Sequence, residues 1–352
     1  MKVLLLGGTG AMGVYLQTLL SDNGFKVAIT SRSARSSNSD NVRYIQGNAL
    51  DEEFLDGVLN EDWDIVVDFM IYSTTMFEQR VEKLLESTKQ YVYLSSARVY
   101  ANSDCKITED SPRLLDVIDD RDFLSTDEYS LAKARQENVL FASTSKNWTI
   151  VRPYITYGDK RFQLGVLEKE SWLHRALKGK TIVFSKEMYD KRTTITSGYD
   201  VAKAIFCLLG KEGACGEVFH ITSNESTSWS EVLDLYCLEL EKKIGCRPKL
   251  LLQELPDFSN HHKGIHQIKY DRFYDRVFDN SKIGEYIEVN DFTSFTKGLK
   301  ACLNDFISDP DFLLINWESE AIRDKYTGEF SYLSEISGVK NKLKYIYFRF
   351  IK

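Results

Sequence analysis

The first twenty residues place the strongest constraint on the fold of this chain. They read "MKVLLLGGTGAMGVYLQTLL": an apolar run, then glycines, then apolar residues at helical spacing. This order predicts a strand, a tight turn and a helix. Two registers of glycines fit the turn, either Gly7, Gly10 and Gly13 or Gly8, Gly10 and Gly13. In both, glycines allow the backbone to approach a pyrophosphate at the helix N-terminus, so the pattern predicts a dinucleotide site.

The segment "KVAITSRS", residues 26–33, predicts the second strand, and its end indicates which dinucleotide binds. A carboxylate there would accept a hydrogen bond from the ribose 2′-hydroxyl of NAD, whereas a basic group accommodates the 2′-phosphate of NADP. Ser31 and Arg32 occupy this place. The sequence therefore favours NADP(H), with NAD(H) as the alternative. Arg35 lies in the serine-rich stretch that follows, where a solvated turn explains it nearly as well.

Apolar runs continue to alternate with helical stretches along the first half of the chain. The runs are "NVRYIQGNAL", "DWDIVVDFMIY", "TKQYVYLSS" and "WTIVRPYITYG". Such alternation predicts an α/β fold with a doubly wound parallel sheet, whose ligands bind at the carboxyl ends of the strands. The end of "YVYLSS" should therefore carry Ser95 and Ser96 to the rim that holds the glycine loop.

A tyrosine and a lysine share one face of a predicted helix in "DEYSLAKARQENVL", residues 127–140. Tyr129 and Lys133 are four residues apart and thus neighbours on a helix. A positive charge beside the phenol favours its phenolate, as a general acid/base near neutral pH requires. Tyr199 and Lys203 repeat the spacing, but no serine-ended strand precedes them. The sequence therefore favours Tyr129.

Composition limits the class of protein. A chain of 352 residues with 43% hydrophobic and 28% charged residues can bury a large core in one α/β unit or two domains. A net charge of -7 gives no general attraction for a phosphate backbone, so no nucleic-acid partner is expected. No apolar run suits a signal peptide or a membrane helix, which predicts a cytoplasmic protein without a membrane partner. The six cysteines lack metal-ligand spacing and are expected to be reduced packing residues, with no metal site.

Taken together, the motifs resemble those of the extended short-chain dehydrogenases/reductases, in the NAD-dependent epimerase/dehydratase family. They are "GGTGAMG", "LSSARVY", "YSLAK" followed by Glu137, "VRPYITYG", "DVAKAI", "GEVFHITS" and "DRFYDRVFDNSKI", in the family's order over residues 1 to about 300. The resemblance implies a Rossmann-type domain over 1–160 with returning segments at about 193–223, and a smaller substrate-binding lobe from 161–192 and 224–310. It leaves the role of residues 311–352 open.

The resemblance also implies roles for individual residues. Tyr129 would be the general acid/base, Lys133 would bind the nicotinamide ribose and lower the tyrosine pKa, and Ser96 would hydrogen-bond the reacting oxygen. The implied cofactor-binding residues are Gly7, Thr9, Gly10, Ala11, Met12, Gly13, Ser31, Arg32, Asn48, Ala49, Phe69, Tyr129, Lys133 and Pro153. The implied substrate-binding residues are Ser96, Arg98, Tyr154, Arg192 and Arg272.

The substrate class rests on Arg272 and Asp275, which fit the R-x-x-D stretch that contacts a substrate diphosphate in the nucleotide-sugar branch. A guanidinium suits a phosphate because it donates two hydrogen bonds at once. The alternative for Arg272 is a surface ion pair within "DRFYDR". Ala97 and Arg98 replace the Asp-Glu pair of dehydratases, which argues against dehydration. Ile155 replaces the usual asparagine, which weakens the expected grip on the substrate.

These observations favour an NADP(H)-dependent oxidoreductase that reduces the 4-keto group of a nucleotide-diphosphate sugar. The alternative is a nucleotide-sugar epimerase with tightly bound NAD. A non-catalytic member that binds only a dinucleotide or RNA is less favoured, because the serine, tyrosine and lysine are all present. A homodimer through two helices per subunit is implied by the resemblance alone.

The last fifteen residues, "GVKNKLKYIYFRFIK", contain basic and aromatic residues and no acid. They could form a helix on a membrane surface. They could also form a final helix or strand that packs its aromatic side on the body and leaves its lysines in water. The sequence favours the second interpretation, because basic amphipathic segments are common on soluble proteins. The basic residues are Lys340, Lys342, Lys344, Arg349 and Lys352.

Overall fold

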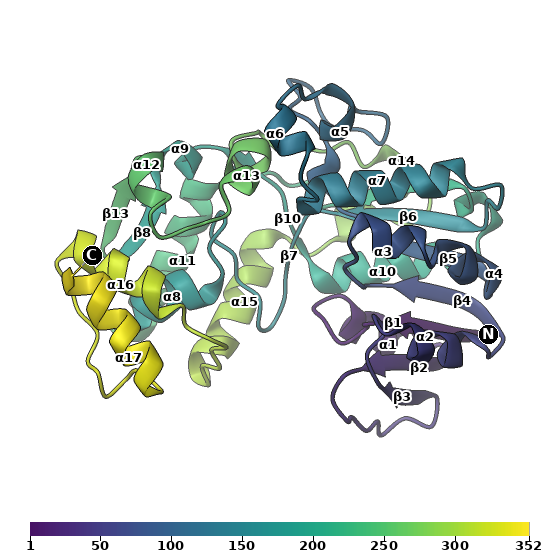
Figure 1. The fold of residues 1–352 in the computed structure, drawn as a ribbon, viewed down its shortest axis with the longest axis horizontal. Coiled ribbons are helices and arrows are strands. Elements are labelled where there is room, and N and C mark those ends of the chain that lie inside the picture. The colour runs from purple at the N-terminus through teal and green to yellow at the C-terminus, as the bar shows by residue number, and fades with distance from the viewer. Residues whose placement is uncertain (352) are drawn as a thin grey trace. The chain divides into compact units, whose positions relative to one another are not determined.

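The computed structural model describes residues 1–351, which form two compact units (Figure 1). Segment 277–295 belongs to the first unit, although the sequence analysis placed it in the substrate-binding lobe. Residues 311–351 are part of the second unit. The first unit comprises 1–158, 194–225 and 277–295, and the second comprises 159–193, 226–276 and the described residues from 296 onward.

The first unit is built on a seven-stranded sheet in the order β11-β6-β5-β4-β1-β2-β3, in which every neighbouring pair is parallel. The strand order reverses at β1 and β4, so the carboxyl ends of these two strands border the crevice where such sheets bind ligands. This is a Rossmann-type α/β fold. The strands are β1 (Lys2–Leu6), β2 (Lys26–Ser31), β3 (Val42–Gln46), β4 (Trp63–Asp68), β5 (Thr88–Leu94), β6 (Trp148–Pro153) and β11 (Glu217–Ile221).

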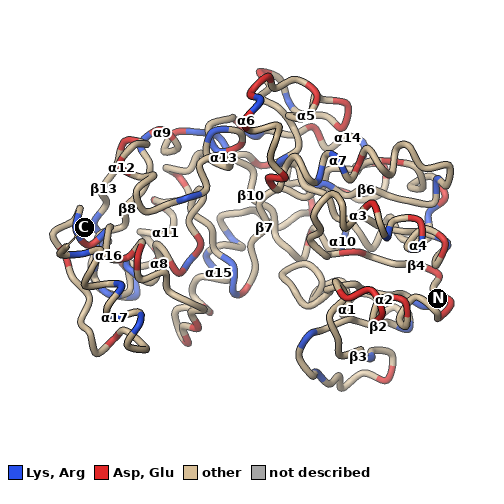
Figure 2. Tube along the Cα trace, in the orientation of Figure 1, with Lys and Arg blue, Asp and Glu red and all other residues tan. Residues whose placement is uncertain are grey.

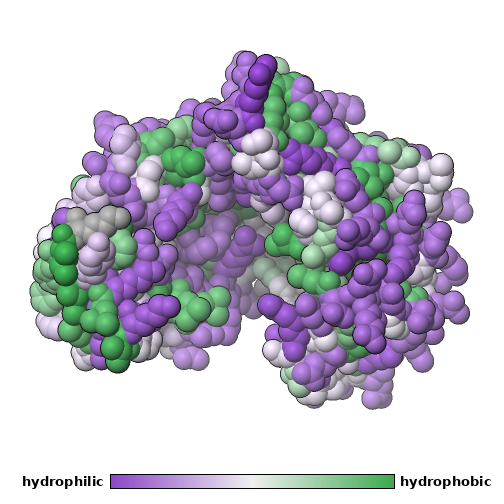
Figure 3. All heavy atoms as spheres, in the orientation of Figure 1, coloured by the Kyte–Doolittle hydropathy of each residue, from purple (hydrophilic) through white to green (hydrophobic). Residues whose placement is uncertain are grey.

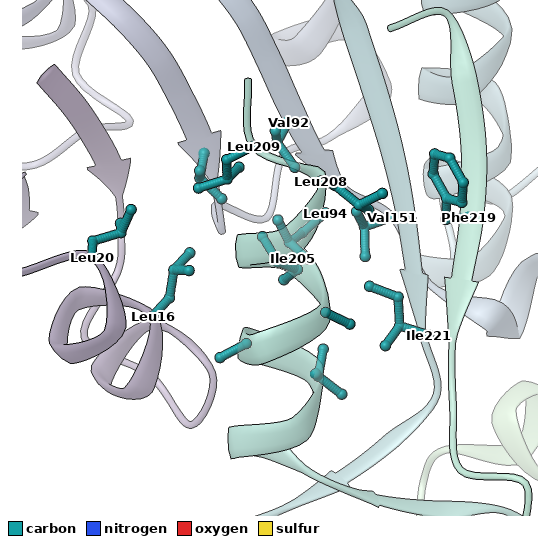
Figure 4. Close-up of a cluster of buried hydrophobic side chains, with 14 of the residues drawn as sticks. Leu16, Leu20, Val92, Leu94, Val151, Ile205, Leu208, Leu209, Phe219 and Ile221 are labelled. Atoms are coloured by element: carbon teal, nitrogen blue, oxygen red, sulfur yellow. The ribbon is translucent and has the colours of Figure 1, made fainter. Parts of the chain in front are cut away.

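Both faces of this sheet are buried, because successive strand residues point to opposite sides. Val3 and Leu5 belong to one apolar cluster, whereas Leu4 and Leu6 belong to another. The first cluster lies under α1 (Gly13–Asp22) and α10 (Gly198–Leu208), and Figure 4 shows leucines and isoleucines of these helices against strand residues. The second cluster lies under α2 (Glu52–Leu59), α4 (Val81–Glu86) and α7 (Tyr129–Ala142).

A buried carboxylate fixes α7 against the sheet. Glu137 is fully buried and accepts hydrogen bonds from Nε and Nη2 of Arg152 at 2.7 Å each and from Oγ of Ser95 at 2.6 Å. Nη1 of Arg113 donates at 3.2 Å. One side chain thereby links α7 to the ends of β5 and β6, and it sets the register of the helix that carries Tyr129.

Short elements complete the first unit. β7 (Ile155–Tyr157) pairs in parallel with β10 (Ile195–Ser197). The others are α3 (Thr74–Glu78), η1 (Ala97–Val99), α5 (Leu114–Val117), α6 (Arg121–Leu124), η2 (Glu212–Ala214), α14 (Ser281–Gly284) and η4 (Val289–Asp291).

The second unit combines two small sheets with helices. β8 (Ile182–Ser185) pairs in parallel with β13 (Leu250–Gln253), and β9 (Arg192–Thr193) pairs antiparallel with β12 (Thr227–Ser228). α11 begins with a capping box of Ser228 and Glu231. The helices are α8 (Lys169–Leu177), α9 (Lys186–Tyr189), α11 (Trp229–Ile244), α12 (Leu255–Phe258), α13 (Ile265–Gln267), η3 (Ile268–Arg272), α15 (Phe295–Ser308), α16 (Trp317–Thr327), α17 (Val339–Ile346) and η5 (Tyr347–Ile351).

Buried ion pairs hold the C-terminal region inside the second unit. The guanidinium of Arg175 is fully buried and pairs with Glu320 at 2.7 Å and with Asp324 and Glu329 at 2.8 Å each. The hydroxyl of Tyr345 donates to Asp324 at 2.6 Å. Because removing these acids would leave a buried charge without a partner, α16 is an integral part of this unit.

Residues 1–351 contain no helix with the length and apolar character needed to cross a membrane. Within the same residues, no group of three or more His, Cys, Asp or Glu side chains could hold a metal ion. All six cysteines are free; Cys237 is buried as a packing residue should be, whereas Cys105 and Cys246 are exposed, contrary to the expectation for them.

The Glu137 contacts predict a large loss of stability when the charge is removed. Glu137→Gln leaves buried Arg152 without its anion, so we expect the free energy of unfolding to fall by about 3 kcal/mol in urea at pH 7. Glu61→Gln is a matched control, because Glu61 forms an exposed pair with Arg43 and should contribute less than about 1 kcal/mol. Equal losses in the two variants would contradict the role assigned to Glu137.

Candidate functional site

The glycine loop after β1 has the backbone geometry that the sequence predicts. Gly7 adopts a positive φ of 70°, and its N–H donates to Oγ1 of Thr30 at 2.9 Å. A Cβ on Gly13 would lie 2.3 Å from the carbonyl oxygen of Gly8, so only glycine permits this contact between helix and turn. A Cβ on Gly10 would meet no atom within 4 Å. The tight turn, the close contact and the open position are those that a pyrophosphate cradle requires.

The N-terminus of α1 supplies donors next to this loop. Met12 is the N-cap residue, and no side chain among the described residues caps the helix there. The first turn contains no acidic residue. The positive end of the helix dipole therefore favours an anion beside Thr9 to Met12. At Gly198, a Cβ would lie 2.6 Å from the carbonyl oxygen of Ala11, so the start of α10 also supports the loop.

The residues expected to contact the adenosine half lie after β2 and β3. Arg32 is exposed, whereas Ser31 is buried and its hydroxyl donates to the carbonyl oxygen of Ser33 at 2.9 Å. Asn48 is exposed, and its Oδ1 accepts from the N–H of Leu50 at 3.2 Å. Ala49 is buried in the core, which leaves Arg32 and Asn48 as the solvent-facing side chains of this group.

Three further predicted residues follow β4 and β6. Phe69 directly follows β4 and is half-buried, and its N–H donates to the carbonyl oxygen of Leu6 at 2.9 Å. Pro153 ends β6. Tyr154 is buried, with its ring centroid 5.5 Å from that of Phe278. The structure thus brings Phe69 beside the end of β1, whereas Tyr154 packs into the interior.

Tyr129 is the first residue of α7, and Lys133 lies one turn further along the helix. The ammonium of Lys133 is buried, donates to the carbonyl oxygen of Leu94 at 2.7 Å and lies 5.9 Å from the ring centroid of Tyr129. Burial lowers the pKa of Lys133 to about 8, against the opposing charges of Asp68 and Glu137. The predicted pair therefore lies at the end of β5.

A second cation flanks the same tyrosine. The guanidinium of Arg98 lies 5.1 Å from the ring centroid of Tyr129 and pairs with Glu128 at 2.5 Å. Glu128 also caps α7, because its carboxylate accepts from the N–H of Ser130 at 2.7 Å. Oγ of Ser96, which is buried, accepts from the N–H of Arg98 at 3.2 Å. Sequence reasoning missed Glu128, although an acidic residue directly before a helix is a recognisable capping signal.

Tyr199 has a different environment from Tyr129. It is the second residue of α10, is 44% exposed and sets its ring against that of Tyr15 at 5.8 Å. Its contact is therefore one between helices α1 and α10. This is a packing position, in line with the preference for Tyr129.

Two of the three arginines expected to bind substrate, Arg192 and Arg272, lie in the second unit, in contrasting surroundings. Arg272 is buried, pairs with Asp271 and donates from Nε to the carbonyl oxygen of Gly165 at 3.0 Å. The ion pair that the alternative expected within this stretch is therefore present, but it is buried and not on the surface. Arg192 is exposed. Asp275 accepts from the backbone N–H of Arg192 at 2.8 Å, so the expected R-x-x-D partner positions β9.

Comparison with known proteins assigns the family. The model of the NAD dependent epimerase/dehydratase family matches residues 3–222. The chain belongs to this family. The match confirms the resemblance drawn from the sequence motifs, and it spans the glycine loop, Ser96, Tyr129 and Lys133.

Solved structures of several epimerases share the fold of this family member. UDP-glucuronic acid 4-epimerase from Bacillus cereus, in complex with UDP-glucuronic acid and NAD, has a TM-score of 0.64 at 18% identity, covering 88% of this chain and 99% of that one. Epimerase Mth375 from Methanothermobacter thermautotrophicus has a TM-score of 0.65 at 17% identity, covering 92% and 94%.

One curated protein resembles the chain in sequence and is not named as an epimerase. It is the chloroplast stem-loop binding protein of 41 kDa b from Arabidopsis thaliana, 25% identical over 243 residues. The aligned region covers 64% of this family member and 59% of that protein's length.

The depressed pKa of Lys133 predicts a pH dependence of stability. Between pH 8 and 10.5 the unfolded chain holds this proton more often than the folded one, so the contribution of Lys133 to the free energy of unfolding rises with pH. From pH 7.5 to 10 the parent should gain about 2 kcal/mol relative to Lys133→Met. Urea unfolding of both proteins at the two pH values measures the gain.

The same two proteins provide a control at lower pH. Between pH 6 and 7.5 the lysine is protonated in both states, so the difference between the parent and Lys133→Met should stay constant. A constant difference up to pH 10 would mean that burial does not lower this pKa.

Proposed function

We propose that the protein is an NADP(H)-dependent oxidoreductase that reduces the 4-keto group of a nucleotide-diphosphate sugar. The observation that carries the proposal is the placement of Ser96, Tyr129 and Lys133 at the same strand-end rim as the glycine loop. A phenol, a hydroxyl and an ammonium at this rim form the set that proton transfer to a carbonyl oxygen requires. The chain's family membership supports the same chemistry.

The loop from Thr9 to Met12, with open space at Gly10, would bind the dinucleotide, with the N-terminus of α1 beside the pyrophosphate. Arg32 and Asn48 would contact the adenosine half, and Lys133 the nicotinamide ribose. When bound, the nicotinamide supplies the hydride for the carbonyl carbon.

The side chains of α7 and β5 supply the proton chemistry. Tyr129 donates its phenolic proton to the carbonyl oxygen, and Ser96 donates a hydrogen bond to that oxygen as negative charge develops on it. The ammonium of Lys133 and the guanidinium of Arg98 both favour the resulting phenolate, since each places a positive charge near the ring. We therefore propose that Arg98 stabilises the phenolate of Tyr129 in addition to contacting the substrate.

Recognition of the diphosphate would come from arginines of the second unit. Arg192 is exposed and can offer its guanidinium directly. Arg272 would first have to exchange Asp271 for a phosphate, which costs the separation of a buried ion pair. We therefore expect Arg192 to contribute more to substrate affinity than Arg272.

Epimerisation is the second candidate, favoured by structural neighbours that include a UDP-glucuronic acid 4-epimerase solved with NAD. An epimerase uses the same Ser96, Tyr129 and Lys133 but keeps its dinucleotide through turnover, whereas a reductase must exchange it. Mass spectrometry of the purified protein separates the two: retained NAD supports the epimerase, and empty protein that binds NADPH supports the reductase.

Stem-loop RNA binding is a third candidate, favoured only by the name of the Arabidopsis relative. The net charge of -7 opposes it. A gel-shift titration with stem-loop RNA at two salt concentrations tests it. We also propose a cytoplasmic homodimer through two helices per subunit, as the family resemblance implies.

The first test of the proposal is the proton donor. Tyr129→Phe should lower turnover of a nucleotide-4-keto-sugar by about 10²-fold or more, because general acid/base catalysis is lost. Dinucleotide affinity, measured by fluorescence titration, should stay nearly unchanged. Tyr199→Phe is the matched control, with the same chemical change on α10, and should affect neither quantity. A reversal of the two results would remove Tyr129 from the mechanism.

The second test is the cofactor preference. If Arg32 pairs with a 2′-phosphate, the protein should bind NADPH about ten- to a hundredfold more tightly than NADH. This ratio follows because a charge-assisted hydrogen bond contributes about 1.5 to 3 kcal/mol to the binding free energy. Arg32→Ala should abolish most of this preference, and added salt should weaken it. Arg35→Ala, three residues further along, is the control and should keep it. Equal affinities in the parent protein would move the epimerase with NAD to first place.

A further inference from the structure

The last helical segment of the second unit turns two different faces to its surroundings. Tyr345 is buried and Phe348 is half-buried, and both join a cluster with Trp317 and Ile336. These two aromatics behave as expected of a tail packed on the body. The other aromatics of the segment do not.

An apolar stripe remains on the outer face of α17 and η5. Val339 is 73% exposed, Leu343 63% and Phe350 66%, and Tyr347 and Ile351 are exposed as well. Their spacings of four, four and three residues place Val339, Leu343, Tyr347 and Phe350 on one side of a helix. Figure 3 shows hydrophobic atoms where Figure 1 places α17 and the C-terminal end. We call these four residues the outer stripe.

Basic residues border the outer stripe. Lys340, Lys342, Lys344 and Arg349 lie between its members in sequence, and no Asp or Glu occurs from Ile336 to Lys352. Figure 2 shows the basic residues along α17. Lys352 itself lies outside the described residues.

The nearest acids do not neutralise the whole border. Glu318 pairs with Lys344 at 2.9 Å, and Glu335 pairs with Lys178 at the same distance. Among residues 1–351, Lys340 and Lys342 form no ion pair. The border therefore keeps a net positive charge next to exposed apolar side chains.

We propose that α17 and η5 dock onto an anionic lipid surface. The outer stripe would enter the boundary between headgroups and acyl chains, while Lys340 and Lys342 meet the lipid phosphates. A second copy of the chain fits this surface less well, because a symmetric contact would bring the same lysines together. The inference is independent of the proposed catalytic function.

Vesicle sedimentation of the full chain tests the proposal. The parent should bind vesicles of phosphatidylcholine and phosphatidylglycerol at 0.1 M salt at least about tenfold more tightly than vesicles of phosphatidylcholine alone. Leu343→Ser/Phe350→Ser should lower that binding at least about tenfold by removing apolar contact area. Lys340→Glu/Lys342→Glu should lower it by a similar factor.

Matched controls keep the result interpretable. Ile71→Ser/Leu238→Ser also removes two exposed apolar side chains, but from other elements, and should leave binding unchanged. Circular dichroism of each variant checks that it is folded. Sedimentation of neither vesicle type, or binding that survives both α17 variants, would overturn the proposal. So would a parent that self-associates through the outer stripe, seen by analytical ultracentrifugation, without binding vesicles.

Discussion

The buried carboxylate of Glu137 is the contact on which the candidate site depends. Its four hydrogen bonds reach Ser95, Arg113 and Arg152, so β5, β6 and α7 are joined at one point. A helix held there can neither rotate nor slide without separating buried charges. Tyr129 and Lys133 lie on the turns of α7 that precede Glu137, so the same contacts fix their positions. The position of the two residues proposed for catalysis is therefore set by a fully buried ion pair.

The electrostatics around Tyr129 combine a buried cation with a more accessible one. Lys133 is enclosed, and burial brings its pKa down to about 8, close to the pH at which proton transfer must run. Glu128 holds the guanidinium of Arg98 over the ring. The phenol of Tyr129 thus lies near two cationic side chains, one enclosed and one more accessible. Ala97 and Arg98, which stand where the resemblance to dehydratases would place an Asp-Glu pair, thus give this site a positive charge in place of two negative ones.

The parts of the structure that the sequence predicted are those with local signals. The glycine loop, the parallel strands and the helix of Tyr129 each have a period or a turn residue that local sterics dictate. The return of segment 277–295 to the first unit and the burial of Arg272 against Gly165 depend on contacts between residues far apart in the chain. No local period in the sequence signals such contacts. Glu128 falls between these cases, since its capping position is local but its pairing with Arg98 is not. The prediction that the C-terminal segment packs on the body was half right, because the side chain of Tyr345 is buried whereas that of Leu343 is exposed.

The first unit is assembled from three separated stretches of chain, the last of which ends at residue 295. On a ribosome, a continuous Rossmann domain can fold as soon as its own residues have emerged. Here β11 and the segment after residue 277 arrive only after long stretches of the second unit. Until β11 has been made, β6 is the edge strand of the sheet, and its unpaired backbone groups can pair with other chains.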